Sequence, residues 1–184
     1  MNKLTTVEKL DKKQIEDFFS EALNIEKTWP NLKKVGENKT ICLFFWEPST
    51  RTKLSFEHAA KTLGFNVLDF SPSLSSVQKG ESIFETIDAL NLMGVDLCVF
   101  RHPDSVIREL AEHMPDMVFV NAGEGSISHP TQALLDMKTI IDHKNSFDGL
   151  KIVIIGDLDH SRVTSSFVEG ISNFDIESLS FCGH

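Results

Sequence analysis

Short apolar runs alternate with amphipathic stretches over most of the chain. Four of these runs are rich in strand-forming residues, and they occupy residues 40–46, 65–70, 95–100 and 117–122. Each is followed by a stretch whose apolar residues recur at helical spacing. These predicted helices cover residues 49–63, 81–93, 105–114 and 129–142. Continuous apolar strands that alternate with amphipathic helices are typical of a parallel sheet covered on both faces, so the pattern predicts an α/β fold.

Another helix is predicted near the amino terminus, over residues 11–27. Asp11 can cap its start, and Gln14 stands three residues later, which is the spacing of a capping box. The apolar residues of this segment fall on one helix face, which we expect to pack on the core. They are Ile15, Phe18, Phe19, Ala22 and Leu23.

A second unit begins after residues 143–149, which have the composition of a linker. A buried strand, a helix and a further strand are predicted in turn, over residues 151–157, 161–173 and 176–182. One βαβ unit of this size cannot bury both faces of its sheet. We therefore expect residues 1–145 to form one domain and residues 146–184 to be the truncated start of another.

Composition limits the classes of partner. The 184 residues include 27 acidic and 18 basic side chains, which gives a formal net charge of −9. Such an acidic surface argues against a general nucleic-acid or anionic-membrane partner. It does not argue against a small anionic substrate, which senses only a local patch of charge.

The three cysteines fit neither a disulfide framework nor a zinc site, and the sequence has no H-E-x-x-H or paired C-x-x-C motif. We expect Cys42, Cys98 and Cys182 to be buried, reduced thiols, and we expect neither a metal nor a cofactor. The first residues, MNKLTTVEKLDKKQ, do not resemble a signal peptide. No apolar run approaches the ~20 residues that span a bilayer, so a cytoplasmic location is expected.

Candidate chemistry lies in the loops that follow the predicted strands, because ligands of parallel sheets collect at the carboxyl ends of the strands. The segment Ser49-Thr50-Arg51-Thr52-Lys53 follows a strand and opens a helix. Unpaired N–H groups at a helix start, together with hydroxyl donors and an arginine, suit a phosphate group. The segment is neither a Walker A loop nor a G-x-G-x-x-G turn. From the residues alone, an ordinary helix cap with a solvated Arg51 explains it equally well.

Other junctions carry polar residues that could serve the same cleft. Arg101 ends a strand, although a surface arginine is an equal alternative. His129 can donate to a carbonyl oxygen and Gln132 can accept from an NH₂ group. On its own, this pair is better explained as a polar helix start. Residues 75–82 have the composition of a solvated loop, and residues 156–162 form another strand-to-helix turn.

Taken in order, these motifs resemble those of the carbamoyltransferase family. The segment FFWEPSTRTKLSFE at residues 44–57 is similar to the family's phosphate-binding signature. Further landmarks of the family are matched by KGES (79–82), RHP (101–103), NAGEGSISHPTQALLD (121–136) and GDLDHSRV (156–163). The resemblance covers essentially the whole chain. Glu47-Pro48 and the NAG-x-G stretch favour the aspartate subgroup, because the ornithine subgroup commonly has a lysine near the position of Glu47.

The resemblance implies a carbamoyl-phosphate-binding domain with a parallel sheet flanked by helices, followed by the first βαβ unit of an aspartate-binding domain. It assigns the phosphate of carbamoyl phosphate to Ser49, Thr50, Arg51, Thr52 and Arg101. It assigns the carbamoyl carbonyl oxygen to Thr52, Arg101 and His129, and the NH₂ group to Gln132. Catalysis would rest on Arg51, Thr52, Arg101 and His129.

Three further positions are matched. Ser75 and Lys79 match positions that, in this family, reach into the active site of a neighbouring subunit. Arg162 matches a position that holds a carboxylate of aspartate. The family typically forms trimers, sometimes with regulatory subunits.

The implied activity is transfer of the carbamoyl group to the amino group of L-aspartate, which gives phosphate and N-carbamoyl-L-aspartate, a pyrimidine precursor. Because the family's second domain supplies further residues, we expect this chain alone to be inactive. Two alternatives stay open, an ornithine-type carbamoyltransferase and a short homologue that only binds anions.

Three residues depart from the family pattern. Trp46 replaces a smaller aromatic residue, and Glu124 replaces the more usual aspartate. Lys53 stands where arginine is common, and we expect it to form a salt bridge rather than to bind substrate.

Overall fold

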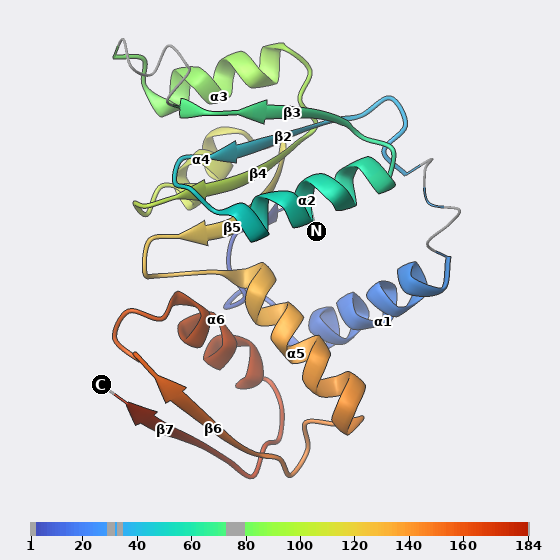
Figure 1. Ribbon diagram of the computed structural model, residues 1–184, viewed down its shortest axis with the longest axis vertical. Coiled ribbons are helices and arrows are strands. Elements are labelled where there is room, and N and C mark those ends of the chain that lie inside the picture. Colours follow the sequence, from blue (N-terminus) through green and yellow to red (C-terminus); the bar gives the residue numbers. More distant parts are fainter. Residues whose placement is uncertain (1–2, 29–31, 33–34, 73–79, 184) are drawn as a thin grey trace.

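The computed structural model describes residues 3–28, 32, 35–72 and 80–183. Within them lies a five-stranded parallel sheet with the strand order β1-β5-β4-β2-β3 (Figure 1). The strands are β1 (Lys3–Leu4), β2 (Thr40–Phe45), β3 (Asn66–Phe70), β4 (Leu97–His102) and β5 (Val118–Glu124). Since the four predicted strands are present and parallel, the predicted α/β fold is confirmed.

Helices cover both faces of this sheet. They are α1 (Lys12–Thr28), α2 (Thr50–Thr62), α3 (Ile83–Leu92), α4 (Ile107–His113) and α5 (Pro130–Lys144). Side chains of α3 and α4 pack on one face, against Phe44 and Cys98, while Phe56 and Ala60 of α2 pack on the opposite face. Helix α5 contacts β5 and lies between the main sheet and the carboxyl-terminal sheet (Figure 1). Its side chains share a hydrophobic cluster with those of α1. The carboxyl ends of the parallel strands therefore share the edge at which α2 and α5 begin.

Stacked aromatic rings connect the central strands. The fully buried Phe44 ring stacks on Phe70 with 4.3 Å between ring centroids and on Phe100 with 4.5 Å. These contacts join β2 to β3 and β4. Trp46 continues the stack, at 6.1 Å from the Phe44 ring. The large aromatic residue at position 46 is therefore accommodated as an extension of the stack.

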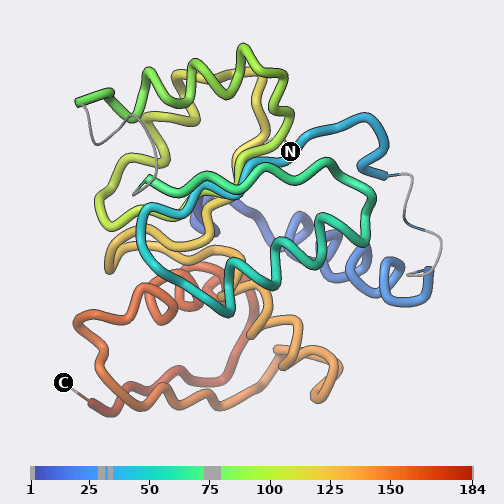
Figure 2. Tube along the Cα trace, turned by 45° about the horizontal axis from the view of Figure 1, so that its top comes forward, coloured from blue at the N-terminus to red at the C-terminus, as the bar shows by residue number. Residues whose placement is uncertain are grey.

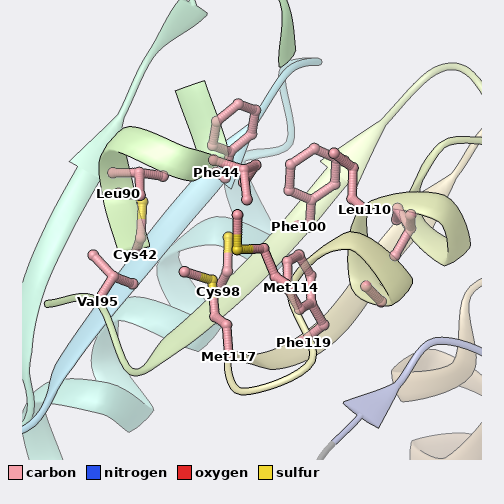
Figure 3. Packing of buried hydrophobic residues seen from close by; sticks show 13 residues of the cluster. Cys42, Phe44, Leu90, Val95, Cys98, Phe100, Leu110, Met114, Met117 and Phe119 are labelled. Atoms are coloured by element: carbon pink, nitrogen blue, oxygen red, sulfur yellow. The ribbon is translucent and has the colours of Figure 1, made fainter. Parts of the chain in front are cut away.

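The cysteines do not all lie in the core. Cys42 and Cys98 are paired in the register of β2 and β4 and are fully buried (Figure 3). Burial raises the pKa of the Cys98 thiol, and the neighbouring Cys42 adds to the effect. Cys182 is exposed, so the prediction that it is buried is wrong.

The carboxyl-terminal residues form a second parallel sheet, made of β6 (Lys151–Gly156) and β7 (Ser178–Gly183) and connected by α6 (Arg162–Ile171). The expected βαβ unit is present, but the expectation that its first strand is buried is wrong. Ile152 and Ile154 pack inward, whereas Val153 and Ile155 are 59% and 76% exposed. Among the described residues a helix covers only one face of this sheet, which leaves the outer face and Cys182 uncovered.

A shared hydrophobic cluster joins the two sheets. The carboxyl-terminal unit, orange to red in Figure 2, packs against α5. Gly170 of α6 lies so close that a Cβ there would be 2.7 Å from the Met137 sulfur. Phe147 is 2% exposed within this cluster, and α5 continues to Lys144. Residues 145–150 form neither helix nor strand and connect α5 to β6. The predicted linker over residues 143–149 therefore begins later than expected, and Phe147 anchors it in the core.

The predicted start of α1 is confirmed, but only part of its apolar stripe is buried. Asp11 Oδ1 accepts from the Gln14 N–H at 2.8 Å, and Gln14 Oε1 accepts from the Asp11 N–H at 3.0 Å, as a capping box requires. The buried part of the apolar stripe consists of Ile15 and Phe19. Phe18 and Leu23 are 40% and 44% exposed, so the expectation that the whole stripe packs on the core is wrong. The described neighbours of α1 cover one side of the stripe.

The strand β1 has no counterpart in the sequence prediction, because two residues carry no periodicity. It pairs with β5, and the Lys3 ammonium donates to the carbonyl oxygens of Ala111 and Met114 at the end of α4.

None of the described helices is both long enough and apolar enough to cross a membrane.

Phe44→Ala should lower the free energy of unfolding by about 3–5 kcal/mol, the usual cost of removing a buried phenylalanine ring. Urea denaturation followed by circular dichroism measures this loss. Leu92→Ala is the control, because Leu92 is 88% exposed and its truncation should change stability by less than about 0.5 kcal/mol. Equal losses in the two variants would contradict the central place of Phe44.

Candidate functional site

A cavity of about 500 Å³ opens at the carboxyl edge of the main sheet. Its lining comes from the starts of α2, α5 and α6 and the end of β4, and consists of Ser49, Thr50, Arg51, Thr52, Arg101, His129, Gln132, Arg162 and Val163. Eight of these nine residues are predicted site residues. The two others, Ser75 and Lys79, lie outside the described residues. The structure therefore brings four separate sequence motifs to one cavity.

The start of α2 forms one wall. Ser49 is the extended N-cap residue, and its side chain makes no capping hydrogen bond to the described helix. The first N–H groups of a helix have no acceptor within the helix, and the helix dipole favours an anion beside them. Arg51 and Thr52 follow at the cavity wall. Lys53 instead pairs with Asp69 at 2.7 Å, so the salt bridge expected for it is confirmed.

Arg101 is buried against the backbone of the neighbouring strand. The residue is 8% exposed, so the alternative of a surface arginine is wrong. One guanidinium nitrogen donates to the Ala122 carbonyl oxygen at 3.2 Å, and the other lies 2.5 Å from Glu47. Its buried Nε has no hydrogen-bond partner among the described residues. Burial and the charge of Arg162 lower the pKa of Arg101, while Glu47 opposes that change.

Glu47 joins two arginines of the cavity lining, Arg101 and Arg162. Its Oε1 accepts from Arg101 and, at 3.1 Å, from Arg162, whose same nitrogen also donates to the Gly125 carbonyl oxygen at 2.7 Å. From the sequence, Glu47 served only to separate two subgroups, and its contact with the two arginines was missed. A carboxylate directly before a predicted anion-binding turn was the available signal, because such a group needs a cation nearby.

Gly123 allows both arginines to lie against the backbone. Its φ is 123°, and a Cβ at this position would lie 2.9 Å from Arg101 Nη1 and 3.3 Å from Arg162 Cζ. Any other residue would therefore push the guanidinium groups away, in addition to adopting a strained backbone conformation.

His129 is held by its backbone and kept neutral by its surroundings. Its N–H donates to the fully buried Ser166 hydroxyl of α6 at 3.0 Å, and its Nδ1 lies 3.4 Å from Thr131 Oγ1. Burial, then the charges of Arg162 and Arg101, lowers the pKa of His129 to about 4. The ring is therefore uncharged at pH 7 and can donate one N–H. Ser166 was missed, because a serine within an amphipathic helix carries no sequence signal.

Gln132 lies in the first turn of α5 and lines the same cavity. Its amide nitrogen donates to Asp136 Oδ1 at 2.9 Å, which leaves the amide oxygen as an acceptor.

A second cavity of about 570 Å³ continues from Arg51 and His129 between α2 and α5. Within the described part of the chain, no three His, Cys, Asp or Glu side chains are grouped so that they could hold a metal ion.

The charges at the cavity favour an anion. Arg51, Arg101 and Arg162 line it, and among the described residues Glu47 is the carboxylate that pairs with two of them. The side chains at the cavity therefore carry more positive than negative charge, even though the whole chain carries a net charge of −9. Neutral donors and acceptors stand beside the cations, so the arrangement can bind a phosphate group and polarise an adjacent carbonyl group.

Comparisons with known proteins agree with this geometry. The family model "Aspartate/ornithine carbamoyltransferase, carbamoyl-P binding domain" matches residues 2–142. An aspartate carbamoyltransferase catalytic subunit of Dehalococcoides mccartyi is 50% identical over 143 residues, which cover 77% of this chain and 43% of the relative. That of Chlorobium phaeovibrioides is 43% identical over 187 residues and is matched along 100% of this chain and 60% of its own length. The chain thus spans about half the length of these relatives.

Solved structures show the same likeness. The aspartate transcarbamoylase of Trypanosoma cruzi, in complex with carbamoyl phosphate and aspartate, superposes with a TM-score of 0.90 at 31% identity, over 97% of this chain and 56% of that one. The catalytic subunit of the M. jannaschii enzyme gives a TM-score of 0.88 at 36% identity, over 100% of this chain and 60% of that one. Since the family model covers most of the chain and the fold agrees, the chain belongs to the aspartate/ornithine carbamoyltransferase family.

Proposed function

We propose that this chain is the carbamoyl-phosphate-binding part of an enzyme that transfers a carbamoyl group to the amino group of L-aspartate. The products are N-carbamoyl-L-aspartate, a precursor of pyrimidines, and phosphate. The observation that carries the proposal is the convergence of Arg51, Arg101, His129 and Gln132 on one cavity. Relatives that are 42–50% identical bear the name of the aspartate enzyme, which supports aspartate over ornithine as the acceptor.

In this proposal the start of α2 binds the phosphate group. Ser49, Thr50 and Thr52 supply hydroxyl groups, and the helix start supplies N–H groups aligned with the helix dipole. Arg51 supplies a permanent charge and paired donors suited to phosphate oxygens. The same groups stabilise the charge of the phosphate as it leaves.

The carbamoyl group lies between the start of α2 and the start of α5. The uncharged amine of aspartate attacks the carbamoyl carbon, the bond from that carbon to the phosphate group breaks, and the phosphate leaves with the proton that the amine loses. During the attack, negative charge grows on the carbonyl oxygen of the carbamoyl group. Thr52, Arg101 and the neutral ring of His129 donate to that oxygen and act as an oxyanion hole. The Gln132 amide oxygen accepts from the carbamoyl NH₂ group and so fixes its orientation. The two anionic substrates are held together in one basic cavity, which supplies much of the rate.

Arg162 binds a carboxylate of aspartate in this proposal. In the structure Glu47 accepts from both Arg162 and Arg101. A bound substrate competes with Glu47 for those guanidinium groups, so Glu47 keeps the cations in place until an anion arrives.

The proposal extends to the organisation of the protein. Residues 1–145 form the carbamoyl-phosphate-binding domain and residues 146–184 begin the aspartate-binding domain, which the separation into two sheets supports. In a cytoplasmic homotrimer, to which regulatory subunits bind in some members of the family, Ser75 and Lys79 reach a neighbouring active site.

Arg51→Ala should weaken binding of N-(phosphonacetyl)-L-aspartate roughly 10- to 100-fold, since a hydrogen bond to a charged group contributes about 1.5–3 kcal/mol. Isothermal titration calorimetry of the chain measures the change in Kd. Lys53→Ala is the matched control: it removes a cation two residues along the same helix, but one that pairs with Asp69. The proposed phosphate site would be contradicted if the two substitutions weakened binding of this ligand equally, or if Arg51→Ala did not weaken it.

The neutral state of His129 gives a pH prediction. Its pKa is about 4 in the folded chain and about 6.5 in an unfolded one. Between these values the unfolded chain binds a proton that the folded chain does not, so folding stability should fall as pH drops from about 6.5 to about 4. We expect His129→Asn to reduce the stability lost between pH 7 and pH 4 by up to about 3 kcal/mol.

Urea denaturation of both proteins at the two pH values makes that measurement, and carboxylates that titrate in the same range affect both alike. His143→Asn, at an exposed position of α5, is the matched control for the substitution. An unchanged pH dependence in His129→Asn would show that the imidazole is charged in the folded chain at pH 5.

A further inference from the structure

Glu124 is a buried carboxylate that the proposed chemistry does not use. It is the last residue of β5, is 6% exposed and is not part of the lining of the anion cavity. One carboxylate oxygen accepts from the backbone N–H of Ile107 at 2.8 Å, and the other accepts from the Asn121 amide at 3.4 Å. A buried carboxylate needs such donors, because its desolvation is otherwise uncompensated. Glu124 thus ties the end of β5 to the start of α4.

The backbone of Glu124 closes the turn that leads to His129. Its N–H donates to the Ser128 carbonyl oxygen at 2.9 Å, and the Ser128 N–H donates back to the Glu124 carbonyl oxygen at 3.2 Å. The next residue, Gly125, donates its N–H to the His102 carbonyl oxygen at 2.9 Å. His129 follows Ser128 directly, so this turn sets the position of the His129 backbone.

The same segment holds both Arg101 and Arg162. The carbonyl oxygens of Ala122 and Gly125, which flank Glu124, accept from Arg101 and Arg162 respectively. Gly123 lies between Ala122 and Gly125 in the sequence, and a Cβ at this position would lie 2.9 Å from Arg101 Nη1 and 3.3 Å from Arg162 Cζ. A displacement of this segment would therefore move both cations.

We propose that Glu124 is a positioning residue for the anion cavity. Its carboxylate fixes the segment from residue 121 to residue 129, and that segment fixes Arg101, Arg162 and His129. Glu124 acts through these side chains and contacts no substrate atom. The inference rests on the proposed function, because those three side chains are the ones assigned to substrate.

Glu124→Gln is the direct test, because it keeps the size of the side chain and removes its charge. The glutamine oxygen can still accept from the Ile107 N–H, but its NH₂ group then faces the NH₂ group of Asn121. The Asn121 amide cannot turn over without losing the bond that its oxygen accepts from the Gly123 N–H at 2.8 Å. Two donors therefore face one another in a buried segment, and the segment must shift to separate them.

Titration of the histidine ring by NMR detects this shift without any need for activity. The charges of Arg162 and Arg101 contribute to the low pKa of His129. If the arginines move away from the imidazole in Glu124→Gln, the pKa of His129 should rise by about 0.5 or more. Removal of the Glu124 charge alone would lower the pKa of His129. A rise in this pKa therefore indicates that the arginines have moved, whereas a fall indicates only the lost charge. The His129 resonance is assigned by its loss in His129→Asn.

Affinity for inorganic phosphate gives a second measurement. We expect the Kd from calorimetry to be about tenfold higher in Glu124→Gln than in the unsubstituted chain. Glu109→Gln is the matched control, because it removes the same charge from the first turn of α4 at an exposed position. It should leave both the pKa of His129 and the Kd for phosphate unchanged.

An unaltered pKa and an unaltered Kd in folded Glu124→Gln would overturn the proposal. If that variant does not fold, Glu124→Asp decides the question. Its side chain is one methylene shorter and does not reach the Ile107 N–H from the same backbone, so we expect smaller changes in the same direction, and their absence would again overturn the proposal. Failure of the unsubstituted chain to bind phosphate would count against the proposed function, whereas the His129 titration would still test Glu124.

Discussion

The geometry of the cavity depends on holding two like charges close together. Arg101 and Arg162 repel one another, and Arg101 is also partly removed from water. Glu47 accepts from both, and the carbonyl oxygens of Ala122 and Gly125 satisfy further guanidinium donors. Buried charges persist when they are paired and hydrogen-bonded in this way. The protein's own groups thereby hold the cations in fixed positions, which is the condition for strong electrostatic stabilisation of a reacting anion.

Much of the fold could be predicted from local pattern. The four strands and their helices follow from apolar periodicity, and parallel pairing follows from their alternation. The failures lie where tertiary context decides burial. Val153 and Ile155 have the composition of a buried strand, yet the described residues leave their face uncovered. Phe147 sits among polar residues typical of a linker, yet it fills a space between α1, α5 and α6 that no local pattern reveals.

The site could be predicted in part, for a related reason. Parallel strands bring their carboxyl ends to one edge, so side chains that follow different strands were expected to meet, and Arg101 and His129 do meet at the cavity of Arg51. Sequence reasoning found the groups whose chemistry is visible in one dimension. It missed Glu47 as a counter-charge and Ser166 as a backbone acceptor, because their partners are 54 or more and 37 residues away in the chain. Such contacts are set by packing rather than by spacing.

Helix α6 contributes to both sides of the cavity at once. Arg162 at its first turn donates to Glu47, and Ser166, one turn later, accepts from the backbone of His129. A helix behaves as a stiff rod over this distance, so the two contacts cannot be adjusted independently. The position of α6 therefore determines both where the Arg162 guanidinium group lies and where the His129 backbone is anchored. A substitution that displaces this helix would disturb a cation and a neutral donor of the cavity together.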